Sequence, residues 1–197
     1  MLVFLDRQHV GKPSRRSDMG AGVDLDGDGV IETWEQESTW TAKYLLAAEL
    51  RLRDLGHEVI PLSDGAYNQR HDRSNRYKQH DEPAVYVAAH INAGGGHYGS
   101  VFYDFRSRFG GDLAEKICER LRARCPELQQ DARAIECSPD NWTKNAWYTI
   151  RGTRSIAVCF EPCFLDSPAH KGLFSGSGMD RIGWALAEGI DKFCKEI

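Results

Sequence analysis

Residues 83–92 read Pro-Ala-Val-Tyr-Val-Ala-Ala-His-Ile-Asn, and this stretch decides the fold. Its apolar run is too short for a helix and rich in β-favouring Val and Tyr, which is typical of a buried central strand. The run ends on the polar residues His90 and Asn92. In open α/β sheets, the functional site lies at the carboxyl ends of such strands. We therefore expect His90 to belong to a site.

Two other short apolar runs end in the same way. Residues 2–6 lead to His9, and residues 156–158 lead to Glu161. Because the carboxyl ends of neighbouring parallel strands meet at one edge of a sheet, these side chains are expected to converge with His90. Two His residues and a Glu brought together in this way are typical of a zinc hydrolase.

Further strand-like segments alternate with helical ones along the chain. The other strand-like segments are residues 58–62, 100–104 and 133–137. Apolar residues three and four apart predict helices over residues 35–55, from Gly110 onward, and over residues 180–197. This alternation predicts one α/β domain over residues 1–197. Its three layers would be an about six-stranded, mainly parallel sheet with helices on both faces.

Composition and hydropathy argue against nucleic-acid binding, a transmembrane span and a signal peptide. The 197 residues are 41% hydrophobic and 27% charged, with a formal net charge of -4. Nucleic-acid binding needs a concentrated basic surface, so nucleic acid is not expected as a partner. No apolar run reaches the about 18 residues of a transmembrane span. The residues after Met1 already read as a core strand, so no signal peptide is expected.

Residues 24–35 match the twelve-residue calcium-binding loop. Carboxylates stand at its positions 1, 3, 5 and 12, as Asp24, Asp26, Asp28 and Glu35. Gly29 at position 6 allows the sharp turn, and Ile31 is the aliphatic residue at position 8. The alternative is an acidic surface turn, which would not require Gly, Ile and Glu at these offsets. We therefore predict a Ca²⁺ site in this loop.

Glu37 lies in the first turn of the helix predicted after this loop. It stands three and four residues before Trp40 and Thr41, on the stripe that faces the core. A carboxylate on an apolar stripe needs a partner, and a metal shared with the two His residues is the natural one. The alternative is a first-turn Glu favoured by the helix dipole alone.

Two sets of residues have more than one interpretation. The segment 138–148, predicted to be a loop, holds Trp142, Trp147 and Tyr148, which would either line a groove or pack beneath the loop. The chain has six cysteines: Cys118, Cys125, Cys137, Cys159, Cys163 and Cys194. Free buried thiols are expected, although disulfides would form in an oxidising compartment. Cys159 and Cys163 flank Glu161, but zinc ligation by these thiolates is the weaker alternative.

Together these residues resemble the zinc-dependent N-acetylmuramoyl-L-alanine amidases, the amidase-3 family of peptidoglycan hydrolases. The resemblance covers nearly the whole chain in order and spacing, through His9, Asp18-Met-Gly-Ala21, Glu37, Gly56-His-Glu-Val59, Arg73-x-Asn75, His90-x-Asn92 and Phe160-Glu161-x-x-Phe164. It implies that His9, Glu37 and His90 bind zinc and that Glu161 is the catalytic carboxylate.

The chain also departs from the family pattern. Residues 6–11 read Asp-Arg-Gln-His-Val-Gly where the family has Asp-Pro-Gly-His-Gly-Gly, and Cys163 stands where the family has Gly. The calcium-type loop is an insertion that the resemblance does not explain. Asn92 and Arg73 would orient ligands or substrate, with turn or helix-surface roles as the alternative.

The resemblance implies hydrolysis of the amide bond between N-acetylmuramic acid and L-alanine in peptidoglycan. Glu161 would take a proton from water and pass it to the leaving amine. Peptidoglycan is the expected partner of a monomer that acts on the bacterial cell wall, as part of a secreted enzyme or as a phage-type lysin. The alternatives are a non-catalytic, calcium-organised wall-binding module and a zinc peptidase that cuts within the stem peptide.

Overall fold

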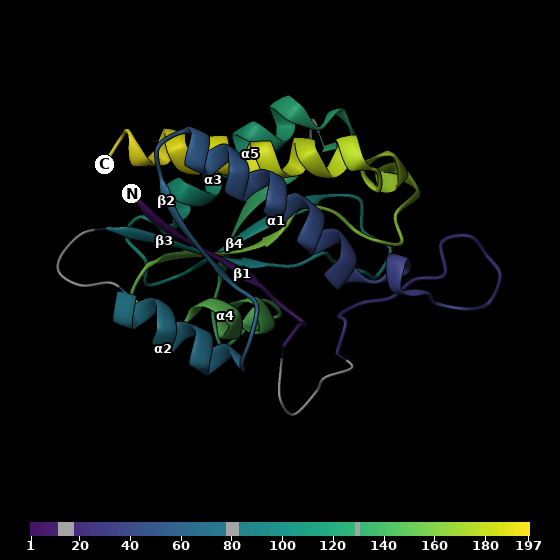
Figure 1. The fold of residues 1–197 in the computed structure, drawn as a ribbon, viewed down its shortest axis with the longest axis horizontal. Coiled ribbons are helices and arrows are strands. Elements are labelled where there is room, and N and C mark those ends of the chain that lie inside the picture. The colour runs from purple at the N-terminus through teal and green to yellow at the C-terminus, as the bar shows by residue number, and fades with distance from the viewer. Residues whose placement is uncertain (12–17, 78–82, 129–130) are drawn as a thin grey trace.

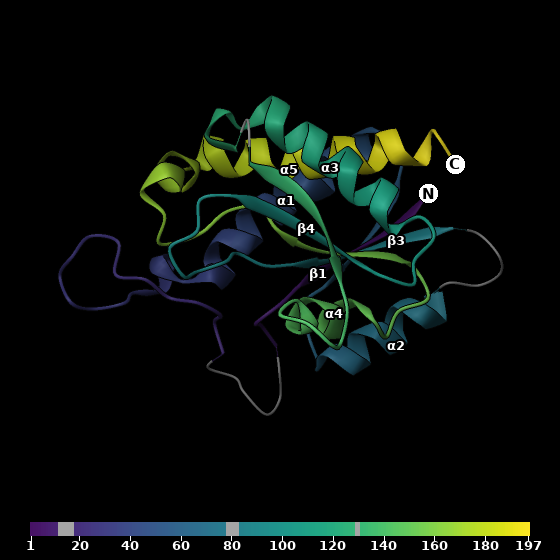
Figure 2. The same ribbon diagram turned by 180° about the vertical axis from the view of Figure 1, so that it is seen from behind.

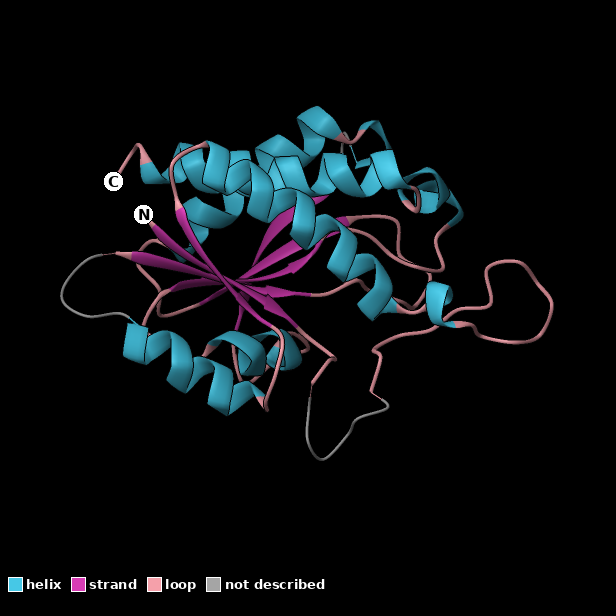
Figure 3. Cartoon of the chain, viewed as in Figure 1, coloured by secondary structure: helices cyan, strands magenta, loops and turns pink. Residues whose placement is uncertain are grey.

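The computed structural model describes residues 1–11, 18–77, 83–128 and 131–197. Its centre is a six-stranded sheet with the strand order β2-β1-β3-β6-β4-β5, and helices cover both of its faces (Figures 1 and 3). The strands are β1 (Leu2–Arg7), β2 (Glu58–Leu62), β3 (Ala84–Ala89), β4 (Gly99–Asp104), β5 (Ala132–Cys137) and β6 (Ile156–Glu161). The predicted three-layer α/β architecture is confirmed.

The sheet is mainly parallel, as predicted. The neighbouring strands β2, β1, β3 and β6 all run in the same direction. β4 pairs antiparallel with β6, and β5 pairs parallel with β4, so two strands at one edge are reversed. Every residue of β3 is buried, because helices cover both faces of the sheet at this central position.

The helices divide between the two faces, as the views from opposite sides show (Figures 1 and 2). One face carries α1 (Glu37–Asp54), α3 (Gly110–Arg124) and α5 (Gly176–Cys194), and the other carries α2 (Tyr67–Tyr77) and α4 (Lys144–Ile150). Short 3-10 helices span Thr33–Glu35, Pro126–Leu128 and Pro168–Leu173. α4 lies partly within the segment predicted to be a loop, because seven residues are too few for a clear apolar period.

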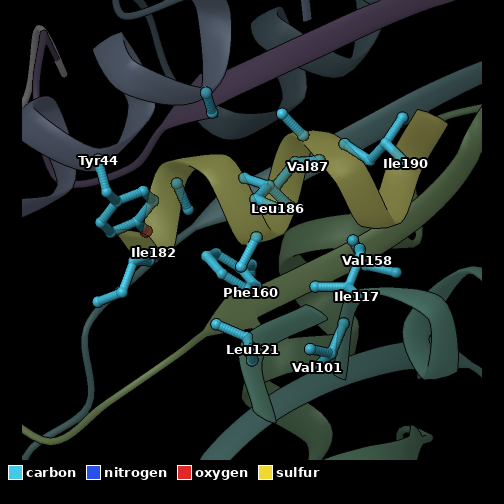
Figure 4. Packing of buried hydrophobic residues seen from close by; sticks show 14 of the residues in the cluster. Tyr44, Val87, Val101, Ile117, Leu121, Val158, Phe160, Ile182, Leu186 and Ile190 are labelled. Carbon is cyan, nitrogen blue, oxygen red and sulfur yellow. The ribbon is translucent and has the colours of Figure 1, made fainter. Parts of the chain in front are cut away.

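The larger hydrophobic core lies between the sheet and the helices α1, α3 and α5. Its residues include Leu186 and Ile190 of α5, which face Val158 of β6 (Figure 4). The ring of Tyr44 packs at 5.6 Å from that of Phe160, edge to face. The Tyr44 hydroxyl also donates to the His90 carbonyl oxygen at 2.9 Å. Core packing therefore helps to fix the carboxyl end of β3.

The six cysteines are free, and five of them are buried, in line with the expectation from sequence. Burial raises the pKa of Cys118 and of Cys137 to about 12, so these thiols stay protonated. Cys159 and Cys163 belong to no metal-type cluster among the described residues. Within the same described ranges, no helix is both long and apolar enough to cross a membrane.

Close packing of α5 against α1 gives the first prediction. A Cβ atom at Gly183 would stand 2.4 Å from the Tyr44 carbonyl oxygen and 2.7 Å from the Ala47 Cβ. Gly183→Ala should therefore lower the free energy of unfolding by about 1–3 kcal/mol, because the helices must move apart. Urea unfolding measures this change.

Gly176→Ala is the matched control in the same helix. No described atom lies within 4 Å of a Cβ at Gly176, so this variant should stay within about 0.5 kcal/mol of the wild type. Equal stability of the two variants would mean that α1 and α5 pack less closely than the structure describes.

Candidate active site

Three neighbouring parallel strands bring the expected side chains together. His9 lies two residues after β1, His90 directly follows β3, and Glu161 is the last residue of β6. The register of these strands brings their carboxyl ends level. Glu37 joins them as the first residue of α1. The convergence predicted from the strand ends is therefore found in the structure.

His9, His90 and Glu37 form a compact cluster of metal-type ligands. His9 Nε2 lies 3.2 Å from His90 Nδ1 and 3.7 Å from Glu37 Oε2, and His90 Nδ1 lies 3.0 Å from Glu37 Oε1. With bonds of about 2.0–2.1 Å, the ligand atoms of a tetrahedral zinc ion stand about 3.3 Å apart. The residue types and the spacing of their atoms therefore fit one zinc ion.

Asp18 orients His9 within this cluster. His9 Nδ1 donates to Asp18 Oδ1 at 2.9 Å, which leaves the lone pair of Nε2 directed at the other two ligand atoms. On His90, Nε2 is buried and has no hydrogen-bond partner among the described residues. No role was predicted for Asp18 from the sequence. The available signal was its place in the segment 18–21, one of those that carry the resemblance.

Glu37 is 3% exposed and is fixed by amides from two distant segments. Ala21 N donates to Oε2 and Ile91 N donates to Oε1, each at 2.9 Å. Burial alone would raise the pKa of Glu37, but His90, His9 and the Ala21 amide outweigh burial and hold the pKa below its usual value. Glu37 is therefore ionised, as a metal ligand must be.

Glu161 lies beside the cluster and keeps its own hydrogen bonds. Asn92 Nδ2 donates to Glu161 Oε2 at 2.8 Å, and the Cys159 thiol lies 3.7 Å from Oε1. Burial raises the pKa of Glu161, and the opposing effect of His90 offsets this only in part. A raised pKa makes the ionised carboxylate a stronger base, which suits a group that takes up a proton.

One cavity of about 640 Å³ is lined by His9, His90 and Glu161. Its lining residues are His9, Asp18, Gly20, Tyr67, His90, Asn145, Ala146, Tyr148, Thr149 and Glu161. Tyr148 is 49% exposed and is the aromatic residue that α4 contributes to the wall. The cavity is therefore open to solvent beside the ligand cluster and is large enough for part of a polymeric substrate.

The structure does not bring three of the proposed substrate-contacting residues to this cavity. Trp147 is a buried residue of α4 and packs in the smaller core cluster. Trp142 is exposed, with its ring 6.0 Å from that of Phe102. Arg73 pairs with Asp64 at 2.7 Å on the surface. Of the four residues proposed to contact ligands or substrate, only Asn92 reaches a site residue.

The segment 24–35 lies beside the site and projects away from the layers, at the right in Figure 1 and at the left in Figure 2. Its carboxylates form two groups whose oxygens lie within 4.8 Å of one another, Asp24 with Asp26 and Glu35, and Asp26 with Asp28 and Glu32. Glu32, at position 9 of the loop, was not predicted, although that position often supplies a ligand. Gly29 has a φ of 86°, the left-handed turn expected at position 6.

The fold and the site together define a three-layer α/β protein with a metal-type cluster of His9, Glu37 and His90. The family model described as N-acetylmuramoyl-L-alanine amidase (Amidase_3) matches residues 3–192. The chain therefore belongs to the N-acetylmuramoyl-L-alanine amidase family, whose members act on the peptidoglycan of the bacterial cell wall. No curated protein sequence matches the chain.

Solved structures share the fold. Cwp6 from Clostridium difficile has a TM-score of 0.76 at 21% identity, and the match covers 97% of this chain and 29% of that one. The CwlD amidase of Clostridioides difficile, solved in complex with the GerS lipoprotein, gives 0.74 at 18% identity over 100% and 99% of the two chains. AmiC2 of Nostoc punctiforme gives 0.75 at 17% identity over 99% and 97%.

Gly20 leaves the space that the Glu37 carboxylate occupies. A Cβ atom at Gly20 would lie 2.3 Å from Glu37 Oε2, and the φ of +78° also disfavours other residues. Gly20→Ala should push Glu37 away from the His pair and weaken zinc binding about tenfold or more. Competition with a chromophoric chelator measures the affinity.

Gly56→Ala separates backbone strain from displacement of Glu37. Gly56 has a φ of +87° and no described atom within 4 Å of a Cβ. This variant should lose about 1 kcal/mol of stability and keep its zinc affinity. If Gly20→Ala binds zinc as tightly as Gly56→Ala, the Glu37 carboxylate is not a ligand.

Proposed function

We propose that the chain is a zinc-dependent hydrolase of the amide bond between N-acetylmuramic acid and L-alanine. In this proposal His9, Glu37 and His90 hold the metal, and Glu161 is the catalytic carboxylate. The observation that carries it is the cluster of His9, His90 and Glu37, whose ligand-type atoms lie 3.0–3.7 Å apart. The two His residues of this cluster line the same cavity as Glu161. We further propose that the single domain, with the inserted loop 24–35, acts as a monomer.

Bound zinc would supply a Lewis acid for the scissile carbonyl and for the attacking water. Glu161 accepts the proton of that water at a carboxylate oxygen and then donates it to the leaving L-alanine amine. Asn92 holds Glu161 through the hydrogen bond to Oε2. Asp18 keeps the proton of His9 on Nδ1, and two backbone amides hold Glu37 in place. These groups are therefore in position before substrate binds.

Glu161→Gln tests the proton transfer. The amide keeps the size of the side chain but cannot accept the proton, so wall hydrolysis should fall about 100-fold or more at nearly unchanged zinc content. The assay digests purified peptidoglycan and quantifies new L-alanine amino termini, with zinc measured by elemental analysis. Near-normal hydrolysis by the variant would exclude the proposed role.

His90→Ala is the comparison variant, because it removes one of three protein ligands. Zinc content and activity should fall together in this variant, whereas Glu161→Gln should lose activity alone. New amino termini deeper in the stem peptide would instead indicate a zinc peptidase. No release of either kind by the wild type would favour a wall-binding module.

We also propose that the loop 24–35 binds one Ca²⁺ ion. Support comes from the match of the loop to the twelve-residue pattern and from the clustering of its carboxylates. Calcium binding should raise the melting temperature by roughly 5 °C or more at saturation, with zinc held constant. The measurement compares millimolar calcium with a calcium-selective chelator.

Asp26→Asn is the variant for this test, because Asp26 belongs to both carboxylate groups and is exposed. It should lose most of the calcium-dependent shift. Glu58→Gln removes an exposed carboxylate from β2 and should keep the full shift. An identical melting temperature of the wild type with and without calcium would rule the site out.

A further inference from the structure

His9 has a backbone conformation that its neighbours must maintain. Among the described residues it is the only non-glycine residue with a positive φ, 58°. Such a conformation is unfavourable for a residue with a Cβ atom and persists only where the surroundings over-determine it. In this conformation His9 Nε2 lies 3.2 Å from His90 Nδ1. Some other part of the structure has to hold this segment.

Arg70 of α2 supplies the contacts that do so. Its side chain is fully buried, and it donates through Nη1 to the Arg7 carbonyl oxygen at 2.7 Å and through Nη2 to the Val10 carbonyl oxygen. These carbonyls flank His9, so one guanidinium spans the residue with the unusual conformation. The planar fork of arginine can reach two acceptors at once, which a lysine ammonium on a flexible stem does less well.

The same side chain is fixed by partners on other elements. Arg70 Nη1 donates to Asp6 Oδ1 at 2.6 Å, and Nε donates to the Gly65 carbonyl oxygen at 3.0 Å. Asp6 is also fully buried, and its other oxygen accepts from the Tyr86 hydroxyl and the Gln8 amide. Tyr86 lies on β3, four residues before His90. The network therefore joins the strands that carry the two His residues.

Burying an ion pair is expensive, and such pairs are poor devices for stability alone. Arg70 contacts the backbone on both sides of His9, and Asp6 pairs with Arg70. Neither residue lines the cavity. Some residues hold a metal ligand in its orientation without contacting the metal. Replacing such residues commonly changes the affinity for the metal. The position of the pair therefore fits a role in the geometry of the ligand.

We propose that Arg70 is a positioning residue that clamps the backbone on both sides of His9, and that Asp6 and Tyr86 hold Arg70 in register with the His90 strand. The proposal rests on the proposed function, because it takes His9 as a zinc ligand. Arg70 does not touch the metal or the substrate. It acts through the direction in which His9 points.

Arg70→Lys tests the clamp while keeping a positive charge beside Asp6. A lysine cannot span both carbonyls, so zinc affinity should fall about tenfold or more, measured by chelator competition. With cobalt(II) as a spectroscopic probe at saturation, the visible absorption per bound ion should change, because the ligand geometry changes. A purely structural role for Arg70 would lower stability but leave the spectrum of the bound cobalt unaltered.

Arg76→Lys is the matched control, because Arg76 is exposed on the same helix. It should keep both the wild-type zinc affinity and the cobalt spectrum. Tyr86→Phe is the second variant and removes one hydroxyl from the network without changing its packing. It should weaken zinc binding roughly threefold or more, and it decides the question if Arg70→Lys does not fold.

Different outcomes would overturn the proposed function and the clamp. If the wild type binds neither zinc nor cobalt at His9 and His90, the proposed function fails. If the wild type binds zinc but the folded variants Arg70→Lys and Tyr86→Phe match its affinity and cobalt spectrum, the clamp is overturned.

Discussion

The buried carboxylate of Glu37 is the group on which the rest of the site depends. It accepts hydrogen bonds from the amides of Ala21 and Ile91, which lie far apart in the chain, and it lies against both imidazoles. Displacing it would leave two backbone donors and a buried charge without partners, which is costly. The start of α1, the end of β3 and the segment before the loop 24–35 are therefore held in one arrangement.

The parts that the sequence predicted are those that local pattern determines. The run Ala84–Ala89 is apolar throughout because β3 is covered on both faces, and such a run is visible without knowledge of its partners. His90 and Glu161 then follow from a single rule about where side chains at strand ends lie. Their convergence with His9 required only that the three strands be parallel neighbours, which short apolar runs separated by helices favour.

Features that depend on distant contacts were not predicted. The reversal of β4 follows from its pairing with β6, which lies far along the chain. The sequence shows that segment 138–148 is rich in aromatic residues, but it does not show which of these side chains face the cavity. Within α4, consecutive side chains point about 100° apart, so Tyr148 reaches the cavity while its neighbour Trp147 is buried. The pair Asp6 and Arg70 is separated by 64 positions and has no local signal.

The loop 24–35 is continuous with the metal-type cluster through the backbone. Val23 N donates to the Glu35 carbonyl oxygen at 3.3 Å, and a bridge pairs Gly22 with Gln36, so the two ends of the loop are joined at its base. Glu37 is the next residue, and its amide donates to the Ala21 carbonyl oxygen at 2.8 Å. Ala21 also donates to the Glu37 carboxylate. The base of the loop is therefore joined by backbone hydrogen bonds to the segment that positions Glu37.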